Sequence, residues 1–307
     1  MAVVTIFTPT YNRKQLIERL YQSLLGQTCK EFEWLVIDDG STDGTDEFFS
    51  QLTKQESPFS IFFIKQENGG KHRAINRGVQ IATGELFFTV DSDDYLTVDA
   101  VEKVIKWKNS LDDSHKWAGV AGLRGDSKQN VIGERNNSFD YIDAKNTERR
   151  LFHLQGDKPE IYFTDVLKKF PFPEIPGENF ISEEIVANTL ARNDYYLRWF
   201  NEIIYIGDYL EGGLTYNDNK HAQNPQGCLL WAKGQLLSFP SDWRSRFLAI
   251  GIYHGAVKRK QTIRKTASDL NINVMTSILA YLIVSLYKPL FKLSSKKIGS
   301  LINNSFF

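Results

Sequence analysis

The stretch LFFTVDSDD, residues 86–94, decides the fold, because a short run of apolar, β-branched and aromatic residues ends there in three carboxylates. Asp91, Asp93 and Asp94 therefore follow the predicted strand at its carboxyl end, which is where open α/β sheets bind their ligands. The Asp-x-Asp spacing allows two carboxylates to approach one divalent cation, and such a cation can hold a diphosphate. For the motif alone, an Asp-rich turn that caps the next helix is the competing interpretation.

Strands and helices alternate on both sides of this stretch. The expected strands cover residues 3–8, 34–37, 60–64 and 86–90, and the expected helices are one that contains Ile17, Leu20, Tyr21 and Leu24, then residues 45–52, 71–82 and 98–107. Four such alternations imply right-handed crossovers. The sequence therefore predicts an α/β fold with a mostly parallel sheet sandwiched by helices.

The composition is that of an ordinary globular protein, but its charges are unevenly distributed. Of the 307 residues, 42% are hydrophobic and 24% are charged, and the formal net charge is zero. Residues 256–297 nevertheless hold nine Lys or Arg residues and one acidic residue, Asp269. This asymmetry argues against a nucleic-acid-binding protein. It indicates a main domain that handles its anions through a metal, followed by a basic tail.

Missing signals exclude several classes of protein. Cys29 and Cys228 lie far apart and have no CxxC companion, so they offer neither a disulfide framework nor a zinc site. The first residues, MAVVTIFTPTYNRK, lack a basic region before their apolar run and break at Pro9, which is typical of a first strand and not of a secretory signal. We therefore expect a cytoplasmic protein. No GxGxxG follows the first strand, and no GxxxxGK(S/T), HExxH or GxSxG motif occurs.

Four segments of the chain carry a family resemblance. They are TPTYNR at 8–13, VIDDGSTDGT at 36–45, NGGKHRAINRGVQIATGE at 68–85 and VDSDD at 90–94. In this order and spacing they resemble the nucleotide-sugar-binding half of the family 2 glycosyltransferases, which have the Rossmann-like GT-A fold. The match is close over residues 3–110 and looser to about residue 217.

The resemblance implies a division of the chain into domains. A GT-A catalytic domain would cover residues 1–217, with a nucleotide-sugar half at 1–110 and an acceptor half at 111–217. Residues 218–307 would form a helical C-terminal extension with a basic, membrane-associating tail. Near the end of the catalytic domain, YLEGGLTY at Tyr209–Tyr216 contains two glycines that suit a mobile lid.

The resemblance also assigns the nucleotide contacts. In such enzymes the loop after the first strand and the DDGSTD loop hold the base and the ribose. A carboxylate can accept a hydrogen bond from the uracil imide, and a Tyr or Arg side chain can lie against the ring. These roles fall on Thr8, Tyr11, Asn12, Arg13 and Asp39.

Two basic residues and the three acids complete the expected donor site. Lys71 and Arg73 follow two glycines at a predicted helix start, where backbone N–H groups and cationic side chains can face a phosphate. For Arg73, a solvated helix face stays open as the alternative. The resemblance makes Asp93 and Asp91 the ligands of Mg²⁺ or Mn²⁺, with Asp93 as the more direct one. Asp94 would then support them or contact a sugar hydroxyl.

The acceptor side centres on ISEEIV, residues 181–186. Where the family commonly has Glu-Asp, this chain has Glu183-Glu184, so the resemblance makes Glu184 the expected general base, with a longer side chain than the usual Asp. Ser182 followed by two acids is also typical of an N-cap and a first helical turn, because the helix dipole favours acids there. We expect this capping role for Glu183.

The tail contains eighteen residues without a charge, Leu270–Tyr287, between basic segments. Several Asn, Ser and Thr residues dilute its hydropathy, which makes it a poor candidate for a membrane span. The basic flanks favour a helix that lies in the interface of an anionic leaflet. A helix buried on the catalytic domain, or in a homodimer, is the alternative.

These features predict an inverting hexosyltransferase. The resemblance implies transfer from UDP-glucose or UDP-galactose to a lipid-diphosphate-linked saccharide at the inner face of the cell membrane, with a β-linkage, in bacterial O-antigen or capsule synthesis. A polyprenyl-phosphate sugar synthase and a non-catalytic nucleotide-sugar sensor remain as alternatives. A sugar nucleotidyltransferase is a third, although it would need a Gly-rich, Arg-containing loop where this chain has TPTYNR.

Overall fold

The computed structural model describes residues 2–208, 219–258 and 260–295, with side chains as far as residue 286. The chain divides into two compact units, which we call the sheet unit and the helical unit. The sheet unit comprises Met1–Pro171 and Asp194–Asp208, and the helical unit comprises Phe172–Asn193 and Tyr209–Phe307. The domain boundary expected after residue 217 and the expected lid at Tyr209–Tyr216 lie outside the described residues.

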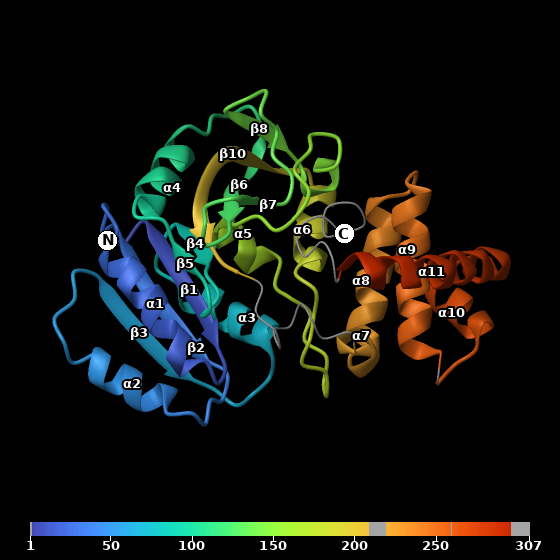
Figure 1. Ribbon diagram of the computed structural model, residues 1–307, viewed down its shortest axis with the longest axis horizontal. Coiled ribbons are helices and arrows are strands. Elements are labelled where there is room, and N and C mark those ends of the chain that lie inside the picture. The colour runs from blue at the N-terminus through green and yellow to red at the C-terminus, as the bar shows by residue number, and fades with distance from the viewer. Residues whose placement is uncertain (1, 209–218, 259, 296–307) are drawn as a thin grey trace. The chain divides into compact units, whose positions relative to one another are not determined.

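The first four strands form the parallel half of one sheet (Figure 1). They pair in the order β3-β2-β1-β4, and every pair is parallel. The predicted alternation of strands and helices is confirmed, and the predicted ends differ by one or two residues. The elements are β1 (Val4–Thr10), α1 (Lys14–Leu25), β2 (Phe32–Asp38), α2 (Thr45–Leu52), β3 (Ser60–Lys65), α3 (Lys71–Ile81), β4 (Leu86–Thr89) and α4 (Ala100–Asn109).

Beyond β4 the sheet becomes mixed, so the expected mostly parallel sheet holds only for its first half. β9 is antiparallel to both β4 and β6, while β10 is parallel to β6 and antiparallel to β5 and β8. Regular strand–helix alternation stops after α4. A strand that follows a long loop can then enter the sheet in either direction. The elements are β5 (Tyr95–Leu96), β6 (Lys116–Gly125), β7 (Val131–Ile132), β8 (Tyr141–Ala144), η1 (Asn146–Glu148), β9 (Glu160–Phe163), α5 (Thr164–Lys169) and β10 (Tyr195–Ile206).

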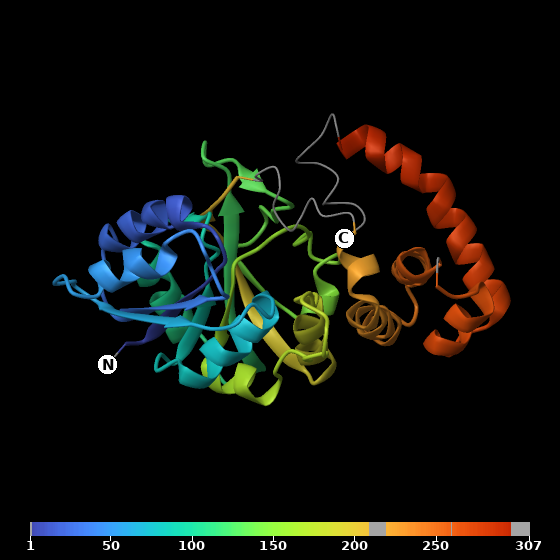
Figure 2. The ribbon, with the colours of Figure 1, turned by 90° about the horizontal axis from the view of Figure 1, so that it is seen from below.

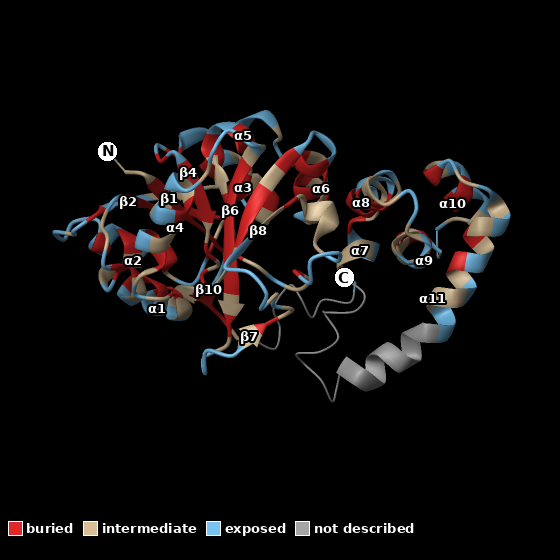
Figure 3. Cartoon of the chain, turned by 90° about the horizontal axis from the view of Figure 1, so that it is seen from above, coloured by how far each residue is buried: buried red, intermediate tan, exposed pale blue. Residues whose placement is uncertain are grey.

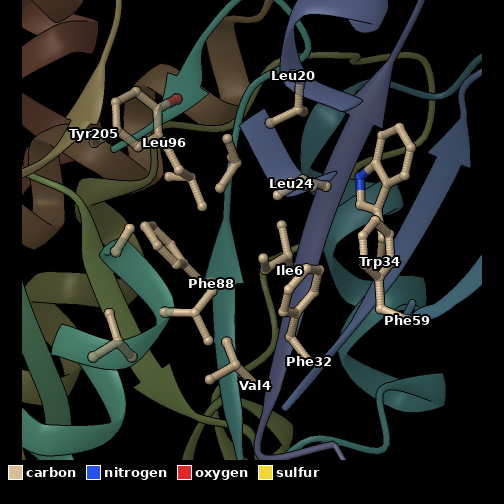
Figure 4. Packing of buried hydrophobic residues seen from close by; sticks show 14 of the residues in the cluster. Val4, Ile6, Leu20, Leu24, Phe32, Trp34, Phe59, Phe88, Leu96 and Tyr205 are labelled. Carbon is tan, nitrogen blue, oxygen red and sulfur yellow. The ribbon is translucent and has the colours of Figure 1, made fainter. Parts of the chain in front are cut away.

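Helices cover both faces of the parallel strands (Figure 2). Alternate residues such as Val4, Ile6 and Phe88 join one buried cluster with residues of α1, α2 and α4 (Figure 4). The intervening residues Phe7 and Phe87 point to the other face, where their rings stack at 4.9 Å between centroids and α3 lies over Phe7. This period of two fixes the register of each strand, because a slip of one residue would exchange the two faces.

The helical unit is a group of helices around a second apolar cluster. The expected helical C-terminal extension is confirmed over its described residues, and the cluster includes Trp231, Ile250, Tyr253, Leu270 and Ala280. The helices are α6 (Glu184–Arg192), α7 (Lys220–Gln223), α8 (Pro225–Ser238), α9 (Trp243–Val257), α10 (Ile263–Leu270) and α11 (Val274–Ser295).

The uncharged stretch of the tail does not form one continuous helix. Asn271 adopts a left-handed conformation with φ of 53° and ends α10, and α11 begins at Val274 with a bend of 112° between the two. Asn tolerates this conformation better than most residues, which explains the position of the break. In the described part of the chain, this bent pair meets the length and hydropathy expected of a membrane span, and no single helix does.

Helix α11 has one packed face and one exposed face (Figure 3). Ser277 and Ala280 are fully buried, and Val284 lies against Gly251 of α9. The tail is thus partly core, but it packs on α9 of the C-terminal extension and not on the catalytic domain named in the alternative interpretation. On its other side α11 exposes four apolar side chains, each at least half exposed: Met275, Leu279, Leu282 and Leu286.

We expect Gly78→Ala to destabilise the sheet unit although Ala is the better helix former. A Cβ at Gly78 would lie 2.4 Å from the ring of Phe7, which is fully buried. Overpacking of this kind costs about 1–3 kcal/mol, against a gain of about 1 kcal/mol in helix propensity. Urea denaturation followed by circular dichroism measures the difference.

Gly234→Ala in α8 is the matched control, because a Cβ there would meet nothing within 4 Å. The same exchange should therefore stabilise the protein by about 0.5–1 kcal/mol. A Gly78→Ala protein as stable as the parent would show that α3 can move away from β1 at little cost.

Candidate active site

Three carboxylates meet directly after β4. One oxygen of each of Asp91, Asp93 and Asp94 lies within 4.8 Å of the other two. The Asp94 N–H closes this turn by donating to the Asp91 carbonyl oxygen at 3.1 Å. Because β4 lies between β1 and β9, the acids stand at the end of a central strand. Grouped carboxylate oxygens are the ligands that Mg²⁺ and Mn²⁺ prefer, so these residues fit the expected metal.

Each carboxylate is paired with a cation from a different part of the sheet unit. The positive charges come from the loop after β1, from the first residue of α3 and from the end of β6, and they balance the three negative charges. The pairs are Lys71–Asp91 at 2.7 Å, Arg13–Asp93 at 3.1 Å and Arg124–Asp94 at 3.2 Å.

Asp94 is the buried member of the group, with 3% of its surface exposed. The Tyr205 hydroxyl donates to its Oδ2 at 2.7 Å, and the close approach of Gly207 leaves no space for a side chain there. Burial raises the pKa of Asp94 to about 7 although Arg124 opposes the change. The side chain is therefore held inward by the protein, and a supporting role fits this position better than contact with a sugar.

Asp91 and Asp93 are the two more exposed acids. Desolvation alone would raise the pKa of Asp91, but the ammonium of Lys71 and more distant guanidinium groups outweigh it and lower the pKa overall. Asp91 is thus fully ionised at neutral pH. Lys71 pairs with Oδ1 of Asp91, and Arg13 pairs with Oδ2 of Asp93. Among the described residues, no group donates to the second oxygen of either acid, so each can offer one oxygen to a cation.

Asp39 organises the loop that leads into α3. Its Oδ1 accepts hydrogen bonds from the Gly69 N–H at 2.9 Å and from the Gln66 amide at 2.8 Å, and its Oδ2 accepts one from the Gly70 N–H at 2.7 Å. Gly70 has φ of 96°, a conformation that favours glycine. Asp39 therefore sets the start of α3, where Lys71 stands, which is a role that the sequence alone did not reveal.

The loop after β1 is joined to the DDGSTD loop. The Asn12 N–H donates to Ser41 Oγ at 2.8 Å, and the Asn12 side-chain oxygen accepts from the Thr42 N–H at 2.8 Å. Tyr11 is 49% exposed beside this junction. Thr8, in contrast, is fully buried, and its hydroxyl accepts a hydrogen bond from Trp34 Nε1 at 3.0 Å. Its side chain belongs to the core.

Three further residues contact the acids, and none of them belongs to a recognised sequence motif. The Arg19 guanidinium donates to the Asp93 carbonyl oxygen, and the Tyr205 hydroxyl accepts from the Asp91 N–H at 3.1 Å. Arg124 completes the set through its ion pair with Asp94. The only sequence signal for Tyr205 and Arg124 is their place near the ends of long strands. Arg73, which the sequence singles out, donates to the Gly69 carbonyl oxygen in its own loop.

Glu184, the expected base, belongs to the helical unit. Its Oε2 accepts hydrogen bonds from Trp231 Nε1 at 2.5 Å and from Gln235 Nε2 at 2.6 Å, both on α8. Glu183 is exposed and occupies the N-cap position of α6, but its side chain makes no capping hydrogen bond. Of the expected site residues, the structure thus groups the three acids with Arg13 and Lys71 in one unit and places Glu184 in the other.

Comparisons with known proteins agree on one family. The model for "Glycosyl transferase family 2" matches residues 5–170. Glycosyltransferase GlyA of Streptococcus pneumoniae is 34% identical over 103 residues, which are 34% of this chain and 14% of GlyA. Poly(ribitol-phosphate) beta-glucosyltransferase of Bacillus spizizenii is 28% identical over 148 residues, which are 46% of this chain and 23% of that protein. The match thus spans less than a quarter of the length of these two relatives.

Solved structures show the same fold. The crystal structure of Staphylococcus aureus TarS 1–349 in complex with UDP-GlcNAc has a TM-score of 0.63 at 18% identity, covering 94% of this chain and 92% of that one. The mannosyltransferase PcManGT of Pyrobaculum calidifontis, in complex with GDP-Man and Mn²⁺, has a TM-score of 0.55 at 16% identity, covering 93% and 87%. The expected GT-A type of α/β fold with a helical C-terminal region is confirmed. Because the family model covers more than half of its residues, the chain belongs to glycosyl transferase family 2.

Proposed function

We propose that this protein transfers a hexose from a UDP-sugar to a lipid-linked saccharide acceptor in the synthesis of a bacterial surface polysaccharide. The observation that carries the proposal is the group of three acids after β4, paired with Lys71 and Arg13. The fold shared with TarS, which was crystallised with UDP and with UDP-GlcNAc, supports a uridine nucleotide as the donor. We propose UDP-glucose or UDP-galactose as the donor in this protein.

In the proposed donor site, Asp93 and Asp91 would hold Mg²⁺ or Mn²⁺, and the ion when bound supplies positive charge to the leaving diphosphate. Lys71 and Arg13 now occupy one oxygen of each acid. Their cationic side chains therefore stand beside the acids, where phosphate oxygens of the donor would bind them well. Tyr11, Asn12 and Asp39 would contact the base and ribose, with Arg73 near the phosphates, whereas the buried Thr8 side chain is left out.

In the proposed transfer, the acceptor oxygen forms a bond to C1 of the sugar as the bond from C1 to the diphosphate oxygen breaks. Glu184 takes the hydroxyl proton in the same step, and UDP leaves with the electron pair. A single displacement inverts C1, so an α-linked donor gives a β-linkage. An acid held by two N–H donors has the fixed orientation that a general base needs.

The acceptor class is proposed from the relatives. Poly(ribitol-phosphate) beta-glucosyltransferase is named for transfer of glucose to a polymer. The chondroitin synthase of Pasteurella multocida, which is 38% identical over 104 residues covering 11% of its length, is named for synthesis of one. This supports a growing saccharide as acceptor, and we propose one linked to a lipid diphosphate in O-antigen or capsule synthesis.

The exposed stripe of α11 favours contact with the inner face of the cell membrane. Met275, Leu279, Leu282 and Leu286 recur at spacings of four, three and four, which places them on one side of the helix. Exposed basic residues lie nearby in the chain, namely Lys258, Lys260, Arg264 and Lys265. Apolar burial and attraction to anionic lipid then act together. A homodimer through the same stripe is the alternative.

Asp93→Ala should abolish turnover and weaken UDP-sugar binding in Mg²⁺ or Mn²⁺, because the diphosphate loses its bridging cation. Turnover of UDP-glucose, UDP-galactose and UDP-GlcNAc with a short-chain lipid-diphosphate saccharide measures the first effect, and calorimetric titration measures the second. Asp113→Ala, which removes an exposed acid, should behave as the parent. Full activity in EDTA would contradict the metal proposal.

Glu184→Gln should lower kcat by roughly 10²–10⁴ with donor affinity little changed, the range usual for a lost general base. Glu183→Gln is the matched control and should lower kcat far less. If Glu184→Gln were harmless, a polyprenyl-phosphate sugar synthase, whose attacking phosphate needs no base, would be favoured instead.

The double variant Leu279→Glu/Leu282→Glu should bind anionic vesicles about 10- to 100-fold more weakly, because each exposed Leu contributes of order 1 kcal/mol when buried in lipid. Point changes are required because residues on the other face of α11 are core, so truncation would disturb α9.

Liposome flotation over a salt series measures the binding, with Leu237→Glu, an exposed α8 residue, as control. A parent protein that never floats but dimerises through the stripe would place a second copy there instead of lipid.

A further inference from the structure

Helix α8 holds the Glu184 carboxylate in one orientation. The Trp231 indole N–H and the Gln235 amide both donate to Oε2, at 2.5 and 2.6 Å. Both donors are buried, with 7% of each residue exposed, and they lie four residues apart on the same side of α8. Among the described residues, no group donates to Oε1. The bound oxygen is thus fixed, and the other oxygen remains able to take a proton.

The same helix also holds the segment that leads into Glu184. Gly227 packs so closely that a Cβ there would lie 2.8 Å from the Phe180 carbonyl oxygen. Four backbone N–H groups are bonded across this contact, which fixes the backbone on both sides of it. The bonds are Gln226 N–H and Gly227 N–H to the Glu178 carboxylate at 2.8 and 2.7 Å, and Asn179 N–H and Phe180 N–H to Asn224 Oδ1 at 2.8 and 3.1 Å.

We propose that Trp231 and Gln235 are positioning residues for catalysis, which hold the Glu184 carboxylate in the orientation in which its other oxygen can accept the acceptor's proton. A fixed orientation reduces the cost of reaching the reactive geometry. The proposal rests on the proposed role of Glu184 as base. It extends the catalytic machinery to α8, which lies beyond the residues matched by the family model.

The histidine ring beside Trp231 carries no charge at neutral pH. The His221 ring lies 5.6 Å from the Trp231 ring, and burial, helped by Lys220, lowers the pKa of His221 to about 4. His221 is therefore neutral above about pH 5. The other charged residues of α6 and α8 are Glu183, Arg192 and Lys233, and all three are exposed.

The test compares Trp231→Phe and Gln235→Leu with the parent. The assay uses a short-chain lipid-diphosphate saccharide and the most active of UDP-glucose, UDP-galactose and UDP-GlcNAc. We expect each variant to lower kcat about tenfold with KM for the donor nearly unchanged, because a hydrogen bond to a charged group is lost.

Trp243→Phe is the matched control, because it makes the same exchange at a residue that is 57% exposed. Its kcat and its KM for the donor should equal those of the parent. If Trp231→Phe does not fold, as judged by circular dichroism and Tm, Gln235→Leu carries the test alone.

Glu184→Gln, measured in parallel, separates the possible failures. If Glu184→Gln is inactive while both α8 variants keep the parental kcat, the positioning role is wrong and the base assignment stands. A lower kcat that comes with an equally weakened KM for the donor also overturns the proposal, since it indicates only a packing role. If Glu184→Gln retains full activity, the base assignment itself is wrong.

Discussion

Charge compensation at the end of β4 is the constraint on which the sheet unit depends. Two carboxylates within 4.8 Å of each other repel each other by roughly 3–4 kcal/mol or more at an effective dielectric constant of about 20, which is several times the net value of a hydrogen bond. The loop after β1, the start of α3 and the end of β6 must therefore each deliver a cation. Strand order makes this feasible, because β1 is the direct neighbour of β4 and its following loop emerges at the same edge.

The first two acids of the DDGSTD loop, Asp38 and Asp39, each hold part of the backbone in place. Asp38 is fully buried and accepts the Ser41 N–H at 2.9 Å, which shapes its own turn. Asp39 instead reaches the Gly69–Gly70 loop and fixes where α3 begins. Asp39 thus connects two loops that are separated by about thirty residues, and the position of Lys71 depends on it. A ligand that bonds to Asp39 would act on the Gly69–Gly70 loop as well.

Much of the sheet unit up to α4 could be predicted from sequence because its signals are local. Each strand, loop and helix up to α4 is contiguous, and the acids that end β4 follow it directly. What could not be predicted depends on distant partners: Tyr205 and Arg124 reach Asp94 from strands more than a hundred and about thirty residues away. The burial of Thr8 follows from Trp34 on the next strand, and the antiparallel β9 from a long loop. The hydropathy pattern could not show the break at Asn271, because it reports the polarity of a stretch and not the backbone conformation of one residue.

The helical unit is discontinuous in sequence, and this affects the order in which the protein can form during synthesis. Phe172–Asn193 emerges first, β10 then returns to the sheet, and the rest of the unit follows. Proteins generally acquire structure as complete units while the ribosome works from the amino end. The Glu184 side chain is made 47 residues before the indole that bonds to it and 51 before the amide. A nascent chain therefore finishes nearly all of its sheet before the carboxylate of α6 gains its donors, and the residues most closely tied to the proposed chemistry are among the last to reach their native contacts.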